Sequence, residues 1–319
     1  MTPPLQPPTW RVEPRRDVVL RDRRVAALRP VVSSDADRMA DFFAALTEQE
    51  IYYFFSLDED EARRLALDAA RDPTYRLIAV DNTRAGELVL GYAFLQWHEE
   101  SVPVFGIGLR GEAQSLGLGR ALLRHLLSSA AVSGVGRVRL TVHPDNGRAL
   151  RLYQRAGFRL VAERINTHQG VKQYRMEADL QATPPAILEG LTIVPLGGMG
   201  VGMAAARVQQ AILEQIGALP LILDRPAQPN GLTIFVADLT VTAAVPGQAG
   251  EDSRRHGESG DAWIVSLDDS SVLVAGVGTA AVERATHRYV ELIRAYDGAG
   301  PDAAIMARIP IAGIAVPGV

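Results

Sequence analysis

Hydrophobic positions recur at two different spacings along residues 1–180, and this alternation predicts a mixed α/β fold. Met39, Phe42 and Leu46 follow helical spacing, so they predict an amphipathic helix. Short apolar runs bounded by turn residues predict strands. Three successive strands, expected to be antiparallel, cover 76–81, 89–97 and 102–109. Further helices are expected at 58–70, 117–131 and 146–155, and further strands at 137–142, 158–166 and 171–178.

A pair of prolines interrupts this pattern and predicts a linker. Pro184 and Pro185 lie in a stretch, 181–190, that has the composition of a connecting segment. A second set of elements follows, with strands at 191–195, 219–223, 232–241, 263–267 and 272–275 and helices at 203–216 and 279–295. The expected division is a flexible tail at 1–17, a first domain at 18–180, a linker at 181–190 and a small α+β accessory domain at 191–319.

Composition limits the class of protein. The chain has 319 residues, of which 47% are hydrophobic, so it can bury a core in each of two domains. No apolar run reaches the roughly 18 residues that a membrane span needs. The Pro-rich start lacks a signal-peptide pattern, and the chain has no cysteine, so we expect a cytoplasmic protein without disulfides, thiolate metal sites or a cysteine nucleophile. No metal site and no membrane partner are expected.

The charge is small and unevenly distributed. Residues 1–180 carry 25 basic and 23 acidic side chains, and residues 181–319 carry 8 and 14, which gives the formal net charge of −4. Neither half is basic enough for a nucleic-acid partner. Lys172 is the only lysine; the other basic side chains are arginines.

A glycine-rich turn between a predicted strand and a predicted helix is the strongest functional signal. Gly117 and Gly119 open the helix at 117–131, where unpaired N–H groups and the helix dipole favour an anion. Gln114 and Arg120 add side-chain donors. The turn lacks the Lys-Ser or Lys-Thr of a Walker loop, and Leu122 departs from a dinucleotide fingerprint. An ordinary glycine-rich loop remains the alternative.

A second segment makes the pattern more specific. Gln114-Ser115-Leu116-Gly117-Leu118-Gly119 is followed by Asn146, Tyr153 and the pair Gly157-Phe158. In this order and spacing, residues 18–180 resemble the GCN5-related N-acetyltransferases (GNAT). The resemblance implies an α/β (α+β) fold with a mixed, mostly antiparallel sheet flanked by helices. It also implies binding of acetyl-CoA (coenzyme A).

The resemblance assigns roles to individual residues. The sheet is expected to splay after the strand at 102–109, where Gly106 and Gly108 would introduce an irregularity, and to receive the pantetheine arm there. Tyr153 would protonate the leaving thiolate; a helix residue packed on the sheet is the alternative. Asn146 would bond the cofactor; a helix N-cap is the alternative. The cofactor-binding residues implied are Ile107, Gly108, Leu109, Gln114, Ser115, Leu116, Gly117, Leu118, Gly119, Arg120, Asn146 and Tyr153.

The general base is the least defined part of the expected site. Attack on a thioester requires a neutral amine, whose pKa is near about 10.4 in its free form, so a base must remove a proton. The family often places a glutamate on the strand that corresponds to 102–109, and here that strand has no ionisable residue. Glu100 is the candidate that we select, although it is also a typical solvated turn residue. The other candidates are His98, Glu99, His143 and His168.

The acceptor is expected to be a small-molecule amine, such as an amino sugar. The aromatic stretch 51–55 and the acids at 58–61 lie near the expected acceptor mouth, although core packing and a helix start also explain them. The resemblance implies an N-acetyltransferase that acts by direct transfer in a ternary complex. A non-catalytic acyl-CoA sensor or scaffold is the alternative. The sequence leaves open whether the chain forms a homodimer.

The second half carries a weaker signal. Gly200-x-Gly202-x-x-Ala205 stands between a strand and a helix, and Asp224 follows at the end of the next strand, as in a dinucleotide-binding unit. Too little chain follows for a full doubly wound domain. Residues 186–319 are more similar to the non-catalytic α+β domain that precedes the barrel in β-hexosaminidases and α-glucuronidases. That resemblance implies a structural role and transfers no catalytic residue.

Overall fold

The structure is a computed structural model. It describes residues 8–11, 15–81, 87–97, 102–167, 169–228, 231–241, 261–268, 270–295 and 314–315. None of the described helices is both long and apolar enough to cross a bilayer.

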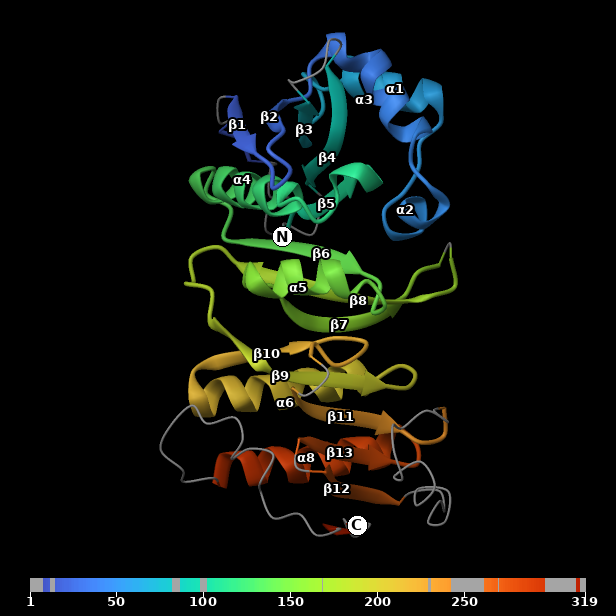
Figure 1. The fold of residues 1–319 in the computed structure, drawn as a ribbon, viewed down its shortest axis with the longest axis vertical. Coiled ribbons are helices and arrows are strands. Elements are labelled where there is room, and N and C mark those ends of the chain that lie inside the picture. The colour runs from blue at the N-terminus through green and yellow to red at the C-terminus, as the bar shows by residue number, and fades with distance from the viewer. Residues whose placement is uncertain are drawn as a thin grey trace, which may run out of the picture. The chain divides into compact units, whose positions relative to one another are not determined.

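The helices and strands predicted for residues 1–180 are present (Figure 1). The strands are β1 (Arg16–Val19), β2 (Val25–Pro30), β3 (Tyr75–Asp81), β4 (Leu88–Gln96), β5 (Val104–Leu109), β6 (Arg137–Val142), β7 (Arg159–Ile165) and β8 (Lys172–Asp179). The helices are η1 (Ser33–Asp35), α1 (Ala36–Ala44), α2 (Glu48–Tyr53), α3 (Glu59–Leu67), η2 (Gly111–Ala113), α4 (Leu118–Val132) and α5 (Gly147–Arg155). Helix α2 was not predicted from the sequence.

The remaining chain alternates strands with two long helices. Its strands are β9 (Ala186–Leu196), β10 (Ala218–Ile222), β11 (Leu232–Asp238), β12 (Ala262–Asp268), β13 (Ser271–Gly276) and β14 (Ile314–Ala315). Its helices are α6 (Val201–Ile216) and α8 (Thr279–Ala295).

The strands form two sheets. The eight-stranded sheet has the order β1-β2-β3-β4-β5-β6-β8-β7, and the six-stranded sheet has the order β10-β9-β11-β13-β12-β14. The predicted antiparallel pairing of the three strands β3, β4 and β5 is confirmed. Strands β1 to β5 pair antiparallel in sequence, whereas β5 and β6 pair in parallel. The mixed, mostly antiparallel sheet flanked by helices is therefore present as expected.

Helices cover both faces of the sheet around β4. Tyr92 contacts the ring of Phe42 of α1, with 6.5 Å between ring centroids. The neighbouring Gly91 faces α4, because a Cβ on it would lie 3.2 Å from Leu122 Cδ1. Since successive strand residues point to opposite faces, α1 and α4 lie on opposite faces of the sheet. This sandwich fixes the position at which α4 begins.

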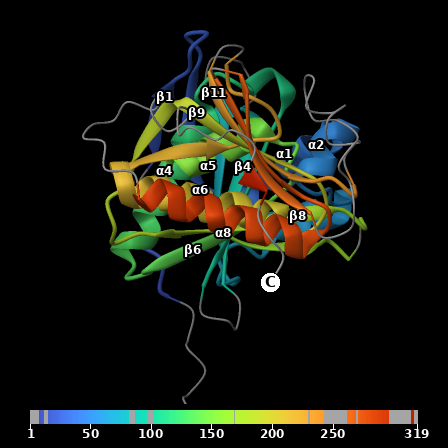
Figure 2. The ribbon, with the colours of Figure 1, turned by 90° about the horizontal axis from the view of Figure 1, so that it is seen from below.

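The second sheet is built on a parallel β-α-β unit. Strand β9 leads through α6 to β10, which pairs with β9 in parallel, and β11 pairs in parallel on the other side of β9. Strand β12 closes an antiparallel hairpin with β13. Helices α6 and α8 lie side by side along this sheet (Figure 2).

The predicted linker needs a correction. Strand β9 begins at Ala186, within the range 181–190, and its register with β10 starts at the same residue. The apolar residues Ile187 and Leu188 extend the strand, so only the part of the range before Ala186 connects the elements. Contacts divide the chain into two compact units, 1–140 with 177–183 and 141–176 with 184–319. The domain boundaries expected from the sequence stay a prediction.

Candidate functional site

The turn before α4 has a left-handed backbone at two positions. Ser115 has φ of 63° and Gly117 has φ of 93°. A Cβ on Gly117 would meet no other atom within 4 Å, so glycine is required there by the backbone conformation and not by crowding. The turn therefore leaves the space in front of the first residues of α4 open.

The N-terminus of α4 has unpaired donors. The first helical bond joins the Ala121 N–H to the Gly117 carbonyl at 3.1 Å, so the N–H groups of Leu118, Gly119 and Arg120 have no partner within the helix. Within the described part of the chain no side chain caps this end, and its first turn contains no acidic residue. Together with the helix dipole, these donors make the start of α4 a candidate anion-binding position.

The hairpin turn between β1 and β2 holds this loop in place. The Arg21 backbone N–H donates to the Leu116 carbonyl at 3.1 Å, and its guanidinium lies 3.3 Å from the Ser115 carbonyl. Arg24 donates to the Glu112 carbonyl at 2.8 Å. These loop carbonyls therefore accept hydrogen bonds from Arg21 and Arg24, which fix the loop before α4.

Gln114 is oriented by the protein itself. Its Nε2 donates to Glu50 Oε1 at 2.9 Å and lies 3.3 Å from the Leu109 carbonyl. Glu50 also accepts from the Thr47 backbone N–H at 2.8 Å, as part of the capping box of α2. The role of Gln114 toward a diphosphate stays a prediction, and Glu50 is a neighbour of the loop that the sequence analysis missed.

The outer edge of β5 offers further backbone donors. The Arg110 N–H bonds to the Leu90 carbonyl of β4, so by alternation the N–H groups of Ile107 and Leu109 point away from β4. Among the described residues the register of β5 with β6 is limited to Val104 opposite Arg139. The splay that the sequence analysis expected between these two strands stays a prediction.

Gly106 and Gly108 make room for aromatic rings and do not interrupt the strand as expected. The register of β5 with β4 is unbroken from Val104 to Leu109, so these glycines introduce no irregularity there. A Cβ on Gly106 would collide with the ring of Phe94, and a Cβ on Gly108 with the ring of Phe54. The glycines make room for aromatic rings that cover this face of β5.

The aromatic stretch 51–55 mostly packs against the core with partly buried side chains. Phe54 and Phe55 pack with Phe43, with ring centroids 6.5 and 5.5 Å away. Tyr52 remains 36% exposed, and it contacts Tyr53 at 5.1 Å. The acids at 58–61 include the N-cap and N3 residues of α3, so they begin that helix. Core packing and helix capping, the simpler of the two expectations, are confirmed for these residues.

Asn146 and Tyr153 lie in the second compact unit, on α5. The Asn146 Oδ1 accepts from the Ala149 N–H at 3.1 Å, so Asn146 is the N-cap of α5. Tyr153 is buried, and its ring lies 5.9 Å from that of Phe158. Burial raises the pKa of the Tyr153 hydroxyl above its usual value, which keeps it protonated at neutral pH. The cofactor and catalytic roles of both residues stay predictions.

Of the candidate bases, only His143 lies among the described residues. Its Nε2 is 3.1 Å from Nε2 of Gln173, and burial lowers the pKa of its imidazole. The imidazole is therefore neutral at pH 7, the form that accepts a proton. The selected candidate Glu100 lies outside the described residues, as do His98, Glu99 and His168.

The glycine turn before α6 is filled by the protein. The carboxylate of Glu163 accepts hydrogen bonds from the N–H groups of Gly200 and Gly202, the second at 2.9 Å. Lys172 pairs with Glu163 at 3.0 Å and donates to the Gly198 carbonyl at 2.9 Å. A dinucleotide would need these same N–H groups, so the NAD alternative does not fit. The sole lysine serves this contact.

Comparison with known proteins shows what the first region is similar to. The model of the acetyltransferase (GNAT) family matches residues 40–158. The ribosomal protein bS18-alanine N-acetyltransferase of Escherichia coli K12 is 31% identical over 102 residues, which cover 32% of this chain and 68% of that protein. The mycothiol acetyltransferase of Corynebacterium aurimucosum is 36% identical over 77 residues. That match covers 23% of this chain and only 25% of the relative's length.

Mycobacterium smegmatis RimJ, solved in complex with CoA-disulfide, has a TM-score of 0.46 at 14% identity, covering 56% of this chain and 92% of that one. The motif residues, the sheet order and the match to the alanine N-acetyltransferase lead to one conclusion: this chain belongs to the GNAT acetyltransferase family.

Proposed function

We propose that this protein transfers an acetyl group from acetyl-CoA to a primary amine, directly within a ternary complex. The observation that carries the proposal is the uncapped start of α4 behind the left-handed Gly117, in a member of the GNAT family. The N–H groups of Leu118, Gly119 and Arg120 would hold the diphosphate. The outward N–H groups of Ile107 and Leu109 would pair with the amides of pantetheine.

The chemistry requires two proton transfers. The amine nitrogen loses a proton to a base and attacks the thioester carbon; the C–N bond forms, the C–S bond breaks, and the thiolate takes a proton. By family resemblance the proton donor is Tyr153, which burial keeps protonated. Glu100 is the proposed base. The chain has no cysteine that could carry the acetyl group as a thioester, in keeping with direct transfer.

The acceptor that we favour is an amino sugar or another small amine. The related proteins differ in this respect, because one is named for mycothiol and another for the alanine of ribosomal protein bS18. A non-catalytic acyl-CoA sensor or scaffold is the second candidate. It is favoured by the lack of an ionisable side chain on β5, where the family often has a glutamate.

Titration calorimetry with the full chain tests cofactor binding. We expect CoA and acetyl-CoA to bind with a dissociation constant well below about 1 mM, the weak end of specific affinities. An acceptor screen with amino sugars, aminoglycosides, polyamines and peptide N-termini then separates the two candidates. Acetyl transfer to any of these amines supports the enzyme. Binding without transfer to any acceptor supports the sensor, and no binding at about 1 mM overturns both.

Replacing Tyr153 with phenylalanine tests the proton donor. We expect kcat to fall by about 100-fold, a typical contribution of general acid catalysis, while the affinity for CoA changes little. Tyr289→Phe is the matched control, because Tyr289 is also a buried tyrosine of the second unit. Its kcat is expected to equal that of the wild type. Equal activity of the Tyr153 and Tyr289 variants in steady-state assays would remove Tyr153 from the acid role.

A further inference from the structure

The side chain of Gln154, on α5, binds the outer edge of β10. Strand β10 is an edge strand of the six-stranded sheet, with β9 on its other side. The Ile222 N–H donates to Gln154 Oε1 at 2.9 Å, and Gln154 Nε2 donates to the Ile222 carbonyl at 2.9 Å. One side-chain amide therefore satisfies both backbone groups of an edge residue, as a neighbouring strand would. Helix α5 and strand β10 both belong to the second compact unit.

Gln209 of α6 holds the Gln154 amide in this orientation. Its Nε2 donates to the Pro220 carbonyl at 2.7 Å and to Gln154 Oε1 at 3.1 Å. Because a carbonyl can only accept, the Pro220 oxygen requires the nitrogen of Gln209 on this side, and that nitrogen in turn requires the oxygen of Gln154. The two glutamines are 2% and 3% exposed, so water has little access to these bonds.

Contacts at both ends of α5 fix its position. Gln154 anchors the last turn, and the first residue, Gly147, lies against Asp224, because a Cβ on Gly147 would be 3.2 Å from Asp224 Oδ1. Tyr153 directly precedes Gln154 and is also buried, with its ring against Phe158. A shift of this nine-residue helix that releases Gln154 would therefore move the Tyr153 hydroxyl as well.

We propose that Gln209 is a positioning residue for the acetyl transfer: through Gln154 it fixes α5 and, with it, the hydroxyl of Tyr153. This inference rests on the function proposed above, in which Tyr153 protonates the leaving thiolate. A displacement of about 1 Å can lower a rate about 100-fold, even when its cause lies far from the reacting atoms. Helix α6 and strand β10, expected from the sequence to belong to a purely structural domain, thereby gain a part in the reaction.

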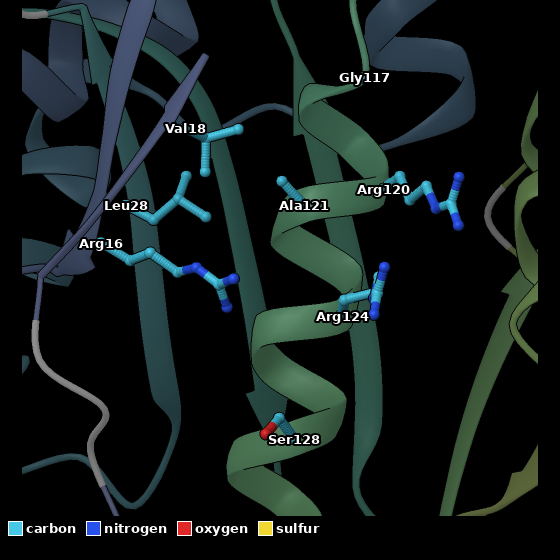
Figure 3. A pocket seen from close by; sticks show the side chains of 8 residues that line it. All are labelled: Arg16, Val18, Leu28, Gly117, Arg120, Ala121, Arg124 and Ser128. Carbon is cyan, nitrogen blue, oxygen red and sulfur yellow. The ribbon is translucent and has the colours of Figure 1, made fainter. Parts of the chain in front are cut away.

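Gln209→Met tests this role in the full chain, because methionine is similar in length but has no N–H donor. We expect kcat to fall about tenfold, since the proton donor is displaced but still present. The affinity for CoA in titration calorimetry should stay that of the wild type. The candidate diphosphate position, with the hollow of about 490 Å³ that β1 and α4 line beside it, lies in the first unit (Figure 3). Gln210→Met is the matched control, because Gln210 bonds to Glu214 of its own helix at 3.0 Å, and its kcat should be that of the wild type.

A double variant separates positioning from a general loss of structure. In Tyr153→Phe the hydroxyl is absent, so adding Gln209→Met should lower kcat no further, whereas a merely structural defect would multiply the two losses. Multiplied losses overturn this inference and leave the proposed function intact. So does a Gln209→Met variant with the kcat of the wild type. If the wild type transfers acetyl to no acceptor, the proposed function is overturned and this inference with it.

Hydrogen exchange on the wild-type chain tests the anchor without any variant. We expect the amides of α5 and α6 to exchange at similar rates, because elements that share a buried network open as one unit. Mass spectrometry of peptides from the two helices measures these rates. Much faster exchange in α5 than in α6 would mean that Gln209 does not hold α5, and this would overturn the inference.

Discussion

Replacing Gly117 with aspartate is expected to lower the affinity for coenzyme A by at least about 100-fold, because like charges brought together in a binding site cost several kcal/mol. The new carboxylate would lie where the first N–H groups of α4 are unpaired, and it would bond to them in place of the diphosphate. Titration calorimetry with CoA measures the loss.

The other end of α4 offers a matched control. Gly134 also has a left-handed backbone, with φ of 81°, and a Cβ there would also meet no atom within 4 Å. Gly134→Asp therefore imposes a similar backbone strain without placing a charge at the candidate diphosphate position. We expect it to bind CoA as the wild type does. Comparable binding by the two aspartate variants would contradict the proposed diphosphate position.

Replacing Glu163 with alanine is expected to lower the free energy of unfolding of the second unit by about 3–5 kcal/mol, as is usual when one partner of a buried ion pair is removed. The Glu163 side chain is 2% exposed and that of Lys172 19% exposed. The variant would leave the Lys172 ammonium and two N–H groups at the start of α6 without their carboxylate. Urea unfolding followed by circular dichroism gives the change in stability.

Glu189 provides the comparison for this experiment. It also pairs with a cation of the same unit, Arg155, at 2.7 Å, but the two side chains are 60% and 50% exposed. Exposed pairs of this kind contribute about 0–1 kcal/mol, so Glu189→Ala should unfold close to the wild type. If Glu163→Ala lost no more stability than Glu189→Ala, the carboxylate would not be what holds the turn before α6.

The elements within residues 1–180 could be predicted because local patterns encode them. The helix at 117–131 differs from α4 by one residue at each end, and Gly117 is its N-cap. Helix α2 was not predicted, although Thr47 and Glu50 form a capping box, which is a local signal in the sequence. The apolar start of β9 was assigned to a linker because Pro184 and Pro185 precede it directly.

Contacts between distant residues could not be predicted from such patterns. Glu163 is far from Gly200 along the chain, and Glu50 is far from Gln114, so no local spacing connects them. The motif Gly200-x-Gly202 therefore looked available to a ligand until the fold brought a carboxylate to it. Conversely, the start of α4 could be predicted as a candidate anion site, because the glycine positions mark where the helix begins and the first N–H groups of a helix are unpaired.

The engagement of the single lysine has a practical consequence for chemical labelling. Apart from Lys172 the chain has no ε-amine, and the Lys172 ammonium is bonded to Glu163 and to a carbonyl. An amine-reactive dye or cross-linker should therefore react poorly with Lys172 while the protein is folded. Labelling of Lys172 then reports local opening at the start of α6. Because the chain has a single lysine, acetyl groups that mass spectrometry detects on the protein itself can be assigned to few sites.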